Sequence, residues 1–65
     1  MHIEGKAALI TGAAAGIGRA IAVALAEKGG RHLTLCDIDD KGLAETAALA
    51  ERRGAAVTAR RLDVA

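Results

Sequence analysis

Short apolar runs alternate along this chain with stretches in which apolar residues recur at helical spacing. Residues 7–10 form an uninterrupted apolar run that ends at a cluster of glycines, which predicts a strand buried on both faces. The apolar residues after this cluster are spaced as on one face of a helix, and we expect a helix from about Gly16 to Lys28. The expected buried stripe consists of Ile17, Ala20, Ile21, Ala24 and Leu25. Gly29 and Gly30 then supply a left-handed helix end.

A second strand and a second helix follow in the same order. Residues 32–36 are mostly apolar and suited to a strand. Asp39 or Asp40 is expected to cap the next helix, because a carboxylate accepts hydrogen bonds from the free N–H groups at a helix start. The stripe of this helix is expected to contain Leu43, Ala47 and Ala50, with Thr46 alongside. Gly54 predicts the end of the helix.

The last predicted element is a third strand over residues 56–59 with Leu62, interrupted by Arg60 and Arg61. Strands and helices that alternate in this way form right-handed β-α-β units with a parallel sheet. We therefore predict the α/β class, a Rossmann-like β-α-β-α-β parallel sheet that is the first half of a doubly wound fold, with strand order 3-2-1. In such a fold the first strand pairs with a fourth, so one edge of the first strand is expected to be open.

The segment between the first strand and the first helix carries the motif with the most specific chemistry. It reads Thr11-Gly12-Ala13-Ala14-Ala15-Gly16-Ile17-Gly18. Gly12 would let the chain turn off the strand, Gly16 would let the backbone approach a pyrophosphate, and Gly18 would let the helix pack close to the sheet. The helix start would present N–H groups to the phosphates. We expect a dinucleotide site here, and the alternative is a glycine-rich turn without a ligand.

The contacts to the cofactor are expected from most of this segment and from the end of the second strand. The candidate residues are Thr11, Gly12, Ala14, Ala15, Gly16, Ile17, Gly18, Asp37 and Ile38. Asp37 follows the loop by about 20 residues, where a carboxylate can accept hydrogen bonds from both hydroxyls of the adenosine ribose. The alternative is that Asp37 serves as a turn or capping residue within an acidic stretch.

The charges around Asp37 favour NAD over NADP as the cofactor. The carboxylate would repel a 2′-phosphate. Ile38 stands where an Arg could hold that phosphate, and Ala15 adds no charge to the loop. Arg19 is the exception, because it is cationic and lies near the loop in sequence.

Composition and charge exclude several classes of function. The chain contains no Phe, Trp, Tyr, Ser or Asn, so it has no Ser nucleophile and no Tyr acid or base. Nine Lys and Arg against eight Asp and Glu leave a net charge of +1, which gives no reason to expect a nucleic-acid or membrane partner. His2 and His32 have no partners at metal-ligand spacing, so no metal site is expected.

The single cysteine and the length of the apolar runs indicate the cellular compartment in which the protein is expected. Cys36 alone cannot form an internal disulfide, which indicates a reducing environment. The early apolar run is shorter than the about 7–15 residues of a signal-peptide core, and no stretch approaches the about 18 apolar residues of a membrane helix. We therefore expect a cytoplasmic protein.

The glycine segment, together with Leu35-Cys36-Asp37 and Leu62-Asp63-Val64, resembles the classical short-chain dehydrogenase/reductase family. The similarity runs from about Lys6 to Val64. It implies a Rossmann fold and an NAD(P)-dependent oxidoreductase that transfers hydride between a nicotinamide cofactor and an alcohol or ketone substrate. It also implies that Asp63 and Val64 line the adenine pocket, and that the complete protein is a homo-oligomer, a dimer or tetramer.

The chain departs from this family in its catalytic residues. The family uses a Tyr, a nearby Lys, a Ser and an Asn, and three of these four residue types are absent here. No lysine of the chain stands in a Tyr-x-x-x-Lys arrangement. We therefore interpret residues 1–65 as the N-terminal dinucleotide-binding part of a single Rossmann domain, truncated after the third strand and inactive alone. The alternative is a non-catalytic dinucleotide-binding or sensing module on the same fold.

Overall fold

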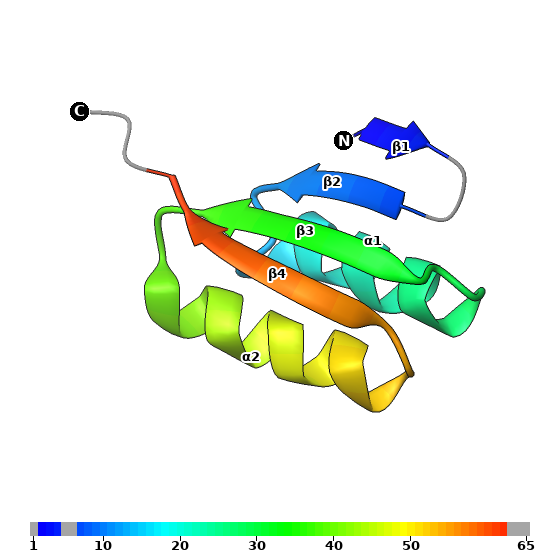
Figure 1. Ribbon diagram of the computed structural model, residues 1–65. Coiled ribbons are helices and arrows are strands. Elements are labelled where there is room, and N and C mark those ends of the chain that lie inside the picture. The colour runs from blue at the N-terminus through cyan, green and yellow to red at the C-terminus, as the bar shows by residue number, and fades with distance from the viewer. Residues whose placement is uncertain (1, 5–6, 63–65) are drawn as a thin grey trace.

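A four-stranded sheet carries two helices on one of its faces (Figure 1). The computed structural model describes residues 2–4 and 7–62. In chain order the elements are β1 (His2–Glu4), β2 (Ala7–Thr11), α1 (Gly16–Glu27), β3 (His32–Asp37), α2 (Asp40–Arg52) and β4 (Ala56–Arg61). Neither helix in this described part is long and apolar enough to cross a membrane.

The strands pair in the order β1-β2-β3-β4. β2, β3 and β4 are parallel, so the predicted order of the three main strands is confirmed, with Leu9 opposite Thr34 and Thr34 opposite Thr58. The expectation of an open edge on the first strand is wrong, because β1 pairs antiparallel to β2 and sets His2 opposite Leu9. Three residues, of which only Ile3 is aliphatic, are too short a run for their pattern to predict a strand.

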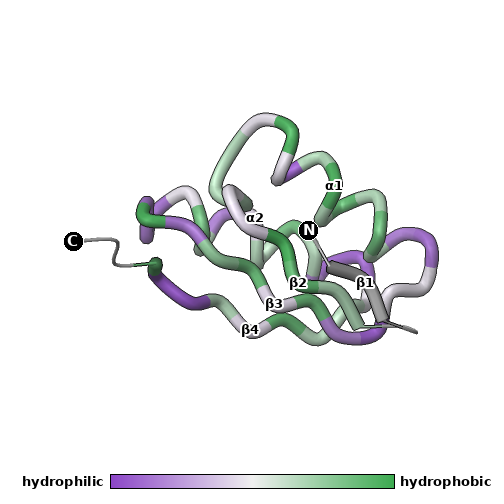
Figure 2. The backbone as a smooth tube through the Cα atoms, turned by 90° about the horizontal axis from the view of Figure 1, so that it is seen from above, coloured by the Kyte–Doolittle hydropathy of each residue, from purple (hydrophilic) through white to green (hydrophobic). Residues whose placement is uncertain are grey.

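The core lies between the sheet and the two helices. Ile10, Leu33 and Leu35 are almost completely buried, because alternate residues of a strand point to the same face and this face meets the helices. The opposite residues of β2 are exposed, including Leu9 at 41%. The first strand is therefore half-buried in this structure, and the expectation of burial on both faces is wrong. Figure 2 shows hydrophobic colours along β2 and hydrophilic colours at the carboxyl end of β4.

The buried face of α1 differs from the predicted stripe. Ala22 and Ala26 are its buried residues, with Ile21 and Leu25 packed partly against the core. The other members of the predicted stripe are exposed, namely Ile17, Ala20 and Ala24. The helix approaches the rest of the fold through small side chains, so the face that makes contact is not the most hydrophobic one.

The helix ends and the face of α2 agree with the sequence. α1 ends at Glu27, one residue before the predicted boundary, and Gly29 after it has a φ of 90°. α2 is capped by the Asp39 carboxylate, which accepts a hydrogen bond from the Gly42 N–H at 3.2 Å. Gly54 follows α2 with a φ of 96°. The buried residues of α2 are Gly42, Leu43, Thr46 and Ala50.

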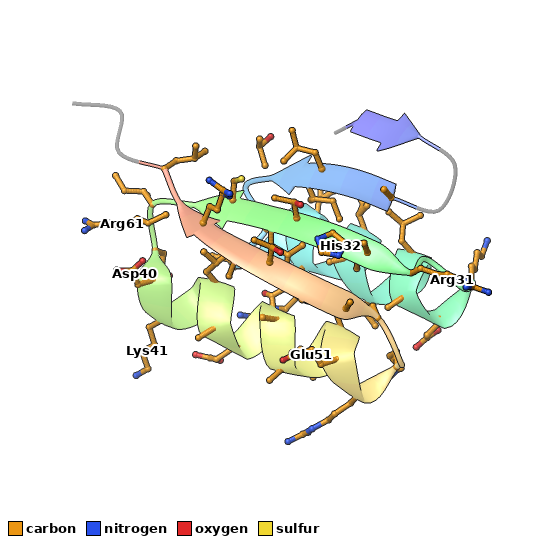
Figure 3. All side chains as sticks on the ribbon, in the orientation of Figure 1. Arg31, His32, Asp40, Lys41, Glu51 and Arg61 are labelled. Carbon is orange, nitrogen blue, oxygen red and sulfur yellow. The ribbon has the colours of Figure 1, made fainter. Side chains whose placement is uncertain are left out.

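β4 continues through Arg60 and Arg61, the two residues that were predicted to interrupt this strand. Arg60 and Arg61 are exposed and pair in register with Cys36 and Asp37 of β3. Their charges stay in solvent while the backbone bonds continue, so the predicted interruption is wrong. Arg61 extends beside Asp40 at the start of α2, with Nε 3.8 Å from Oδ2 (Figure 3).

Candidate functional site

The loop between β2 and α1 adopts the conformation that its glycines permit. Gly12 and Gly16 have φ values of 69° and 59°, in the left-handed region that favours glycine. Gly18 is needed for a different reason: a Cβ there would lie 2.7 Å from the carbonyl carbon of Gly12. The turn at Gly12 is therefore as predicted. Gly18 is closely packed as predicted, but its nearest neighbours are Gly12 and Ala13 of the loop after β2, and not the sheet itself. Gly16 has open space beside it, and its approach to a pyrophosphate stays a prediction.

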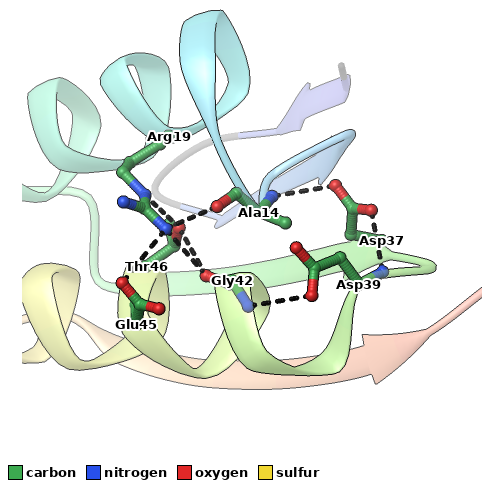
Figure 4. A network of polar contacts seen from close by, with 7 residues as sticks. All are labelled: Ala14, Arg19, Asp37, Asp39, Gly42, Glu45 and Thr46. Atoms are coloured by element: carbon green, nitrogen blue, oxygen red, sulfur yellow. Dashed lines mark hydrogen bonds and ion pairs between the residues drawn. The ribbon is translucent and has the colours of Figure 1, made fainter.

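Two backbone N–H groups of the loop bind the carboxyl end of β3. The Ala13 N–H donates to the Cys36 carbonyl at 3.2 Å. The next N–H, of Ala14, donates to Asp37 Oδ2 at 2.9 Å (Figure 4). The loop and Asp37 lie far apart in sequence, and the fold brings them together as the sequence predicted. The side chains of Ala13 and Ala14 are buried beneath the loop, while Ala15 and Gly16 are exposed.

The Asp37 carboxylate is held in its ionised form by backbone donors. Its Oδ1 accepts a hydrogen bond from the Asp39 N–H at 3.0 Å, and Oδ2 accepts the bond from Ala14. The N–H donors of Asp39 and Ala14, and to a lesser extent that of Ile38, lower the pKa of Asp37 from its usual 3.8, against an opposing effect of burial. Asp37 thus makes the turn contacts of the alternative interpretation. Each carboxylate oxygen keeps acceptor capacity for a further donor, such as a hydroxyl group.

The amino end of α1 faces the same region and carries no side-chain cap. Its N-cap residue is Ala15, and its first turn contains no acidic residue. The backbone N–H groups at this end and the helix dipole therefore favour an anionic group.

Exposed apolar side chains surround the loop and the end of the sheet. Ile17 is 81% exposed, Ile38 57% and Leu62 37%. Ile17 and Ile38 were predicted site residues. Leu62 was predicted to belong to the third strand, but it follows β4 and donates its N–H to the Asp37 carbonyl at 2.9 Å. The predicted residues Asp63 and Val64 lie outside the described part of the chain.

Arg19 lies between the glycine loop and α2 and forms hydrogen bonds with both. Its guanidinium donates to the carbonyl of Ala14 in the loop, and to Gly42 and Thr46 in α2 (Figure 4). Gly42 and Thr46 were not predicted to belong to the site. A signal for Gly42 was present, because a glycine inside a helix costs about 1 kcal/mol relative to alanine and usually marks close packing. Among residues 2–4 and 7–62, no group of three or more metal-ligating side chains is assembled.

Comparison with known proteins identifies the family. The family model described as short chain dehydrogenase matches residues 6–65. A Mycobacterium tuberculosis protein that bears the name oxidoreductase SadH is 56% identical over 62 residues, which cover 95% of this chain and 22% of that protein. The chain thus spans about a fifth of the length of this relative.

Solved structures agree with the family assignment. The alcohol dehydrogenase of the archaeon Thermococcus sibiricus, complexed with 5-hydroxy-NADP, is 42% identical with a TM-score of 0.78; the match covers 89% of this chain and 25% of that one. An NAD+-bound xylitol dehydrogenase is 31% identical with a TM-score of 0.78, over 83% of this chain and 20% of that one. The glycine loop, the Asp37 carboxylate and these matches together show that the chain belongs to the short chain dehydrogenase family of oxidoreductases.

Proposed function

We propose that this chain forms the cofactor-binding part of an NAD-dependent oxidoreductase. The proposed reaction moves hydride between the nicotinamide and an alcohol or ketone substrate. The observation that carries the proposal is the bond from the Ala14 N–H to Asp37 Oδ2, at 2.9 Å. It sets a carboxylate beside the glycine loop, so that one dinucleotide can place its pyrophosphate over the start of α1 and its adenosine ribose at Asp37.

The proposed preference for NAD follows from the charges at the ribose position. Asp37 would accept hydrogen bonds from both ribose hydroxyls and would repel a phosphate on the 2′ oxygen. Ile38 and Ala15 carry no charge, and the guanidinium of Arg19 is engaged by Ala14, Gly42 and Thr46. One similar structure holds NAD+ and another an NADP derivative, so both cofactors belong in the test.

Calorimetric titration of the complete protein with NAD+ and with NADP+ tests this proposal. We expect NAD+ to bind at least about tenfold more tightly, because only NADP+ brings a phosphate dianion to an uncompensated carboxylate. Equal affinity for the two cofactors would contradict the role given to Asp37. Binding of neither would contradict the proposed function itself.

We propose further that residues 1–65 are the N-terminal part of one larger Rossmann domain. The relative from Mycobacterium tuberculosis is matched over only 22% of its length, and the family's Tyr, Ser and Asn are absent from this sequence. The proposed adenine contacts are Asp63 and Val64. The complete protein is proposed to be a homo-oligomer, as the family resemblance implies. It is proposed to be cytoplasmic, and the free, buried thiol of Cys36 is in keeping with a reducing compartment.

The 65-residue chain alone is expected to transfer no hydride. It can supply groups for adenosine and pyrophosphate but no acid or base matched to an alcohol. The measurement is NADH formation by the purified chain with NAD+ and a panel of primary and secondary alcohols. Turnover above the rate without protein, retained through repurification, would contradict this prediction.

A further inference from the structure

Arg19 is the one charged side chain of the described residues that connects the glycine loop to α2. Its Nη2 donates to the Ala14 carbonyl at 2.5 Å and to the Gly42 carbonyl at 3.1 Å. Its Nε donates to Thr46 Oγ1 at 2.8 Å. Glu45 adds an ion pair at 3.9 Å, too long and too exposed to contribute much. We call Arg19 with Ala14, Gly42 and Thr46 the Arg19 clamp (Figure 4).

The α2 side of the Arg19 clamp is closely packed. A Cβ on Gly42 would lie 2.8 Å from the Ala14 carbonyl oxygen and 2.9 Å from the Ala14 Cβ, so no larger residue fits between α2 and the loop. Thr46 is completely buried, and its hydroxyl donates to the Gly42 carbonyl at 3.1 Å while accepting from Arg19. The Thr46 hydroxyl thus fixes the direction of the guanidinium.

Ala14 is held from both sides. Its carbonyl accepts from Arg19, and its N–H donates to Asp37 at 2.9 Å. A shift of the loop away from α2 would therefore break the contact with Asp37 as well. Ala14 thus connects the guanidinium of Arg19 to the carboxylate of Asp37.

We propose that Arg19 is a positioning residue for the cofactor, one that holds the glycine loop against α2 and so sets the loop in register with Asp37. It acts on both NAD and NADP alike and does not bind the 2′-phosphate. To reach a phosphate, the guanidinium would have to leave the Ala14 carbonyl, which is partly buried and would lose a charge-assisted hydrogen bond. This inference rests on the proposed function.

The first test is Arg19→Met in the complete protein, with dissociation constants measured for NAD+ and NADP+. Met keeps an unbranched apolar side chain, about as long as the aliphatic part of Arg, and removes every donor. We expect both constants to rise by the same factor, on the order of tenfold, with the NAD+ to NADP+ ratio unchanged. Weakening of NADP+ alone would overturn the proposal, since it would identify Arg19 as a phosphate ligand. Unchanged constants would overturn it too.

A second variant separates positioning from general stability. Thr46→Val keeps the branched shape and removes the hydroxyl that accepts from Arg19, at a position with no access to a ligand. We expect it to weaken both cofactors less than Arg19→Met does, and to add nothing when combined with Arg19→Met. Additive effects of the two substitutions would contradict a shared clamp. If Arg19→Met does not fold, Arg19→Lys is the replacement variant. It retains the positive charge but lacks the planar set of guanidinium donors, and we expect it to weaken the binding of both cofactors by the same factor.

Arg53→Met is the matched control. Arg53 also bridges the two helices, because its Nε donates to Glu27 Oε1 at 2.8 Å, but it lies after α2 at the end opposite the glycine loop. We expect its removal to leave both dissociation constants unchanged. A loss of affinity equal to that of Arg19→Met would mean that any contact between the helices matters, and would overturn the specific role of the Arg19 clamp.

Amide hydrogen exchange without cofactor distinguishes a failure of the Arg19 clamp from a failure of the proposed function. The Ala14 N–H should exchange faster in Arg19→Met and at the wild-type rate in Arg53→Met. Unchanged exchange in Arg19→Met would overturn the clamp even if cofactors bind. Faster exchange would support the clamp even if neither cofactor bound the wild-type protein, an outcome that would remove the proposed function alone.

Discussion

Replacing Gly18 by Ala should abolish measurable binding of both NAD+ and NADP+ and lower the stability of the protein. A Cβ at this position would overlap the Gly12 carbonyl oxygen and lie 3.0 Å from the Ala13 Cα. All of these atoms belong to the backbone of the glycine loop, so no side chain can turn aside to make room. The loop would have to move outward, and with it the start of α1. We expect a free-energy loss of roughly 1–3 kcal/mol or more, as for overpacked cores.

Gly54→Ala provides the control for this prediction. Gly54 has a φ of 96° with open space beside it, so a methyl group there strains the backbone without touching a neighbour. The expected loss of stability is about 1–2 kcal/mol, similar to that of Gly18→Ala, but Gly54 lies at the far end of α2. Thermal unfolding and calorimetric titration should show two destabilised variants, of which only Gly54→Ala still binds cofactor. Retained affinity in Gly18→Ala would contradict the packing role of Gly18.

The elements of this fold could be predicted where the chain carries local signals. Gly29 and Gly54 end the two helices in left-handed conformations that glycine adopts most easily. Asp39 caps α2 because its carboxylate reaches the free Gly42 N–H. These determinants act over a few residues, so the order of strands and helices, and from it the parallel sheet, follows from the sequence.

The buried face of α1 could not be predicted in the same way. Hydrophobicity places Ile17 in the stripe, yet this side chain is 81% exposed, while Ala22 is completely buried. The distance between α1 and the rest of the fold is set by Gly18, which lies against the backbone of Gly12. Where two segments approach this closely, the size of a side chain determines whether it is buried at the contact more than its hydrophobicity does.

The residues proposed to contact the cofactor could be predicted from the sequence, but the residues that hold the glycine loop in place could not. The glycine loop and Asp37 follow from a motif that has a known physical purpose. The sequence identifies Arg19 as a cation close to the glycine loop. Its partners Gly42 and Thr46, however, lie 23 and 27 residues further along the chain. Contacts of this kind depend on how α2 packs over the loop, which residue spacing along the chain does not encode.

Replacing Asp37 by Ala should reverse or abolish the proposed preference for NAD+. The substitution removes the acceptor for the ribose hydroxyls and also the group that repels a 2′-phosphate. NAD+ affinity should fall on the order of tenfold or more, as expected for lost charge-assisted hydrogen bonds. NADP+ affinity should fall less or rise, because the loss of loop anchoring at Ala14 is offset by the loss of repulsion. The ratio of the two constants is the measurement that isolates the role at the ribose.

Asp40→Asn is the matched control for this ratio. Asp40 belongs to the same acidic stretch and is exposed, but its carboxylate faces Arg61, with Oδ2 3.8 Å from Nε, and does not contact the loop. If the net charge of the acidic stretch set the cofactor preference, removing either carboxylate would shift the ratio by a similar factor. If the position of one carboxylate sets it, only Asp37→Ala shifts the ratio. Of these two carboxylates, that of Asp37 accepts a hydrogen bond from the glycine loop and that of Asp40 pairs with Arg61, so we expect Asp40→Asn to keep the wild-type preference. An equal shift in both variants would refute the assignment of the ribose to Asp37.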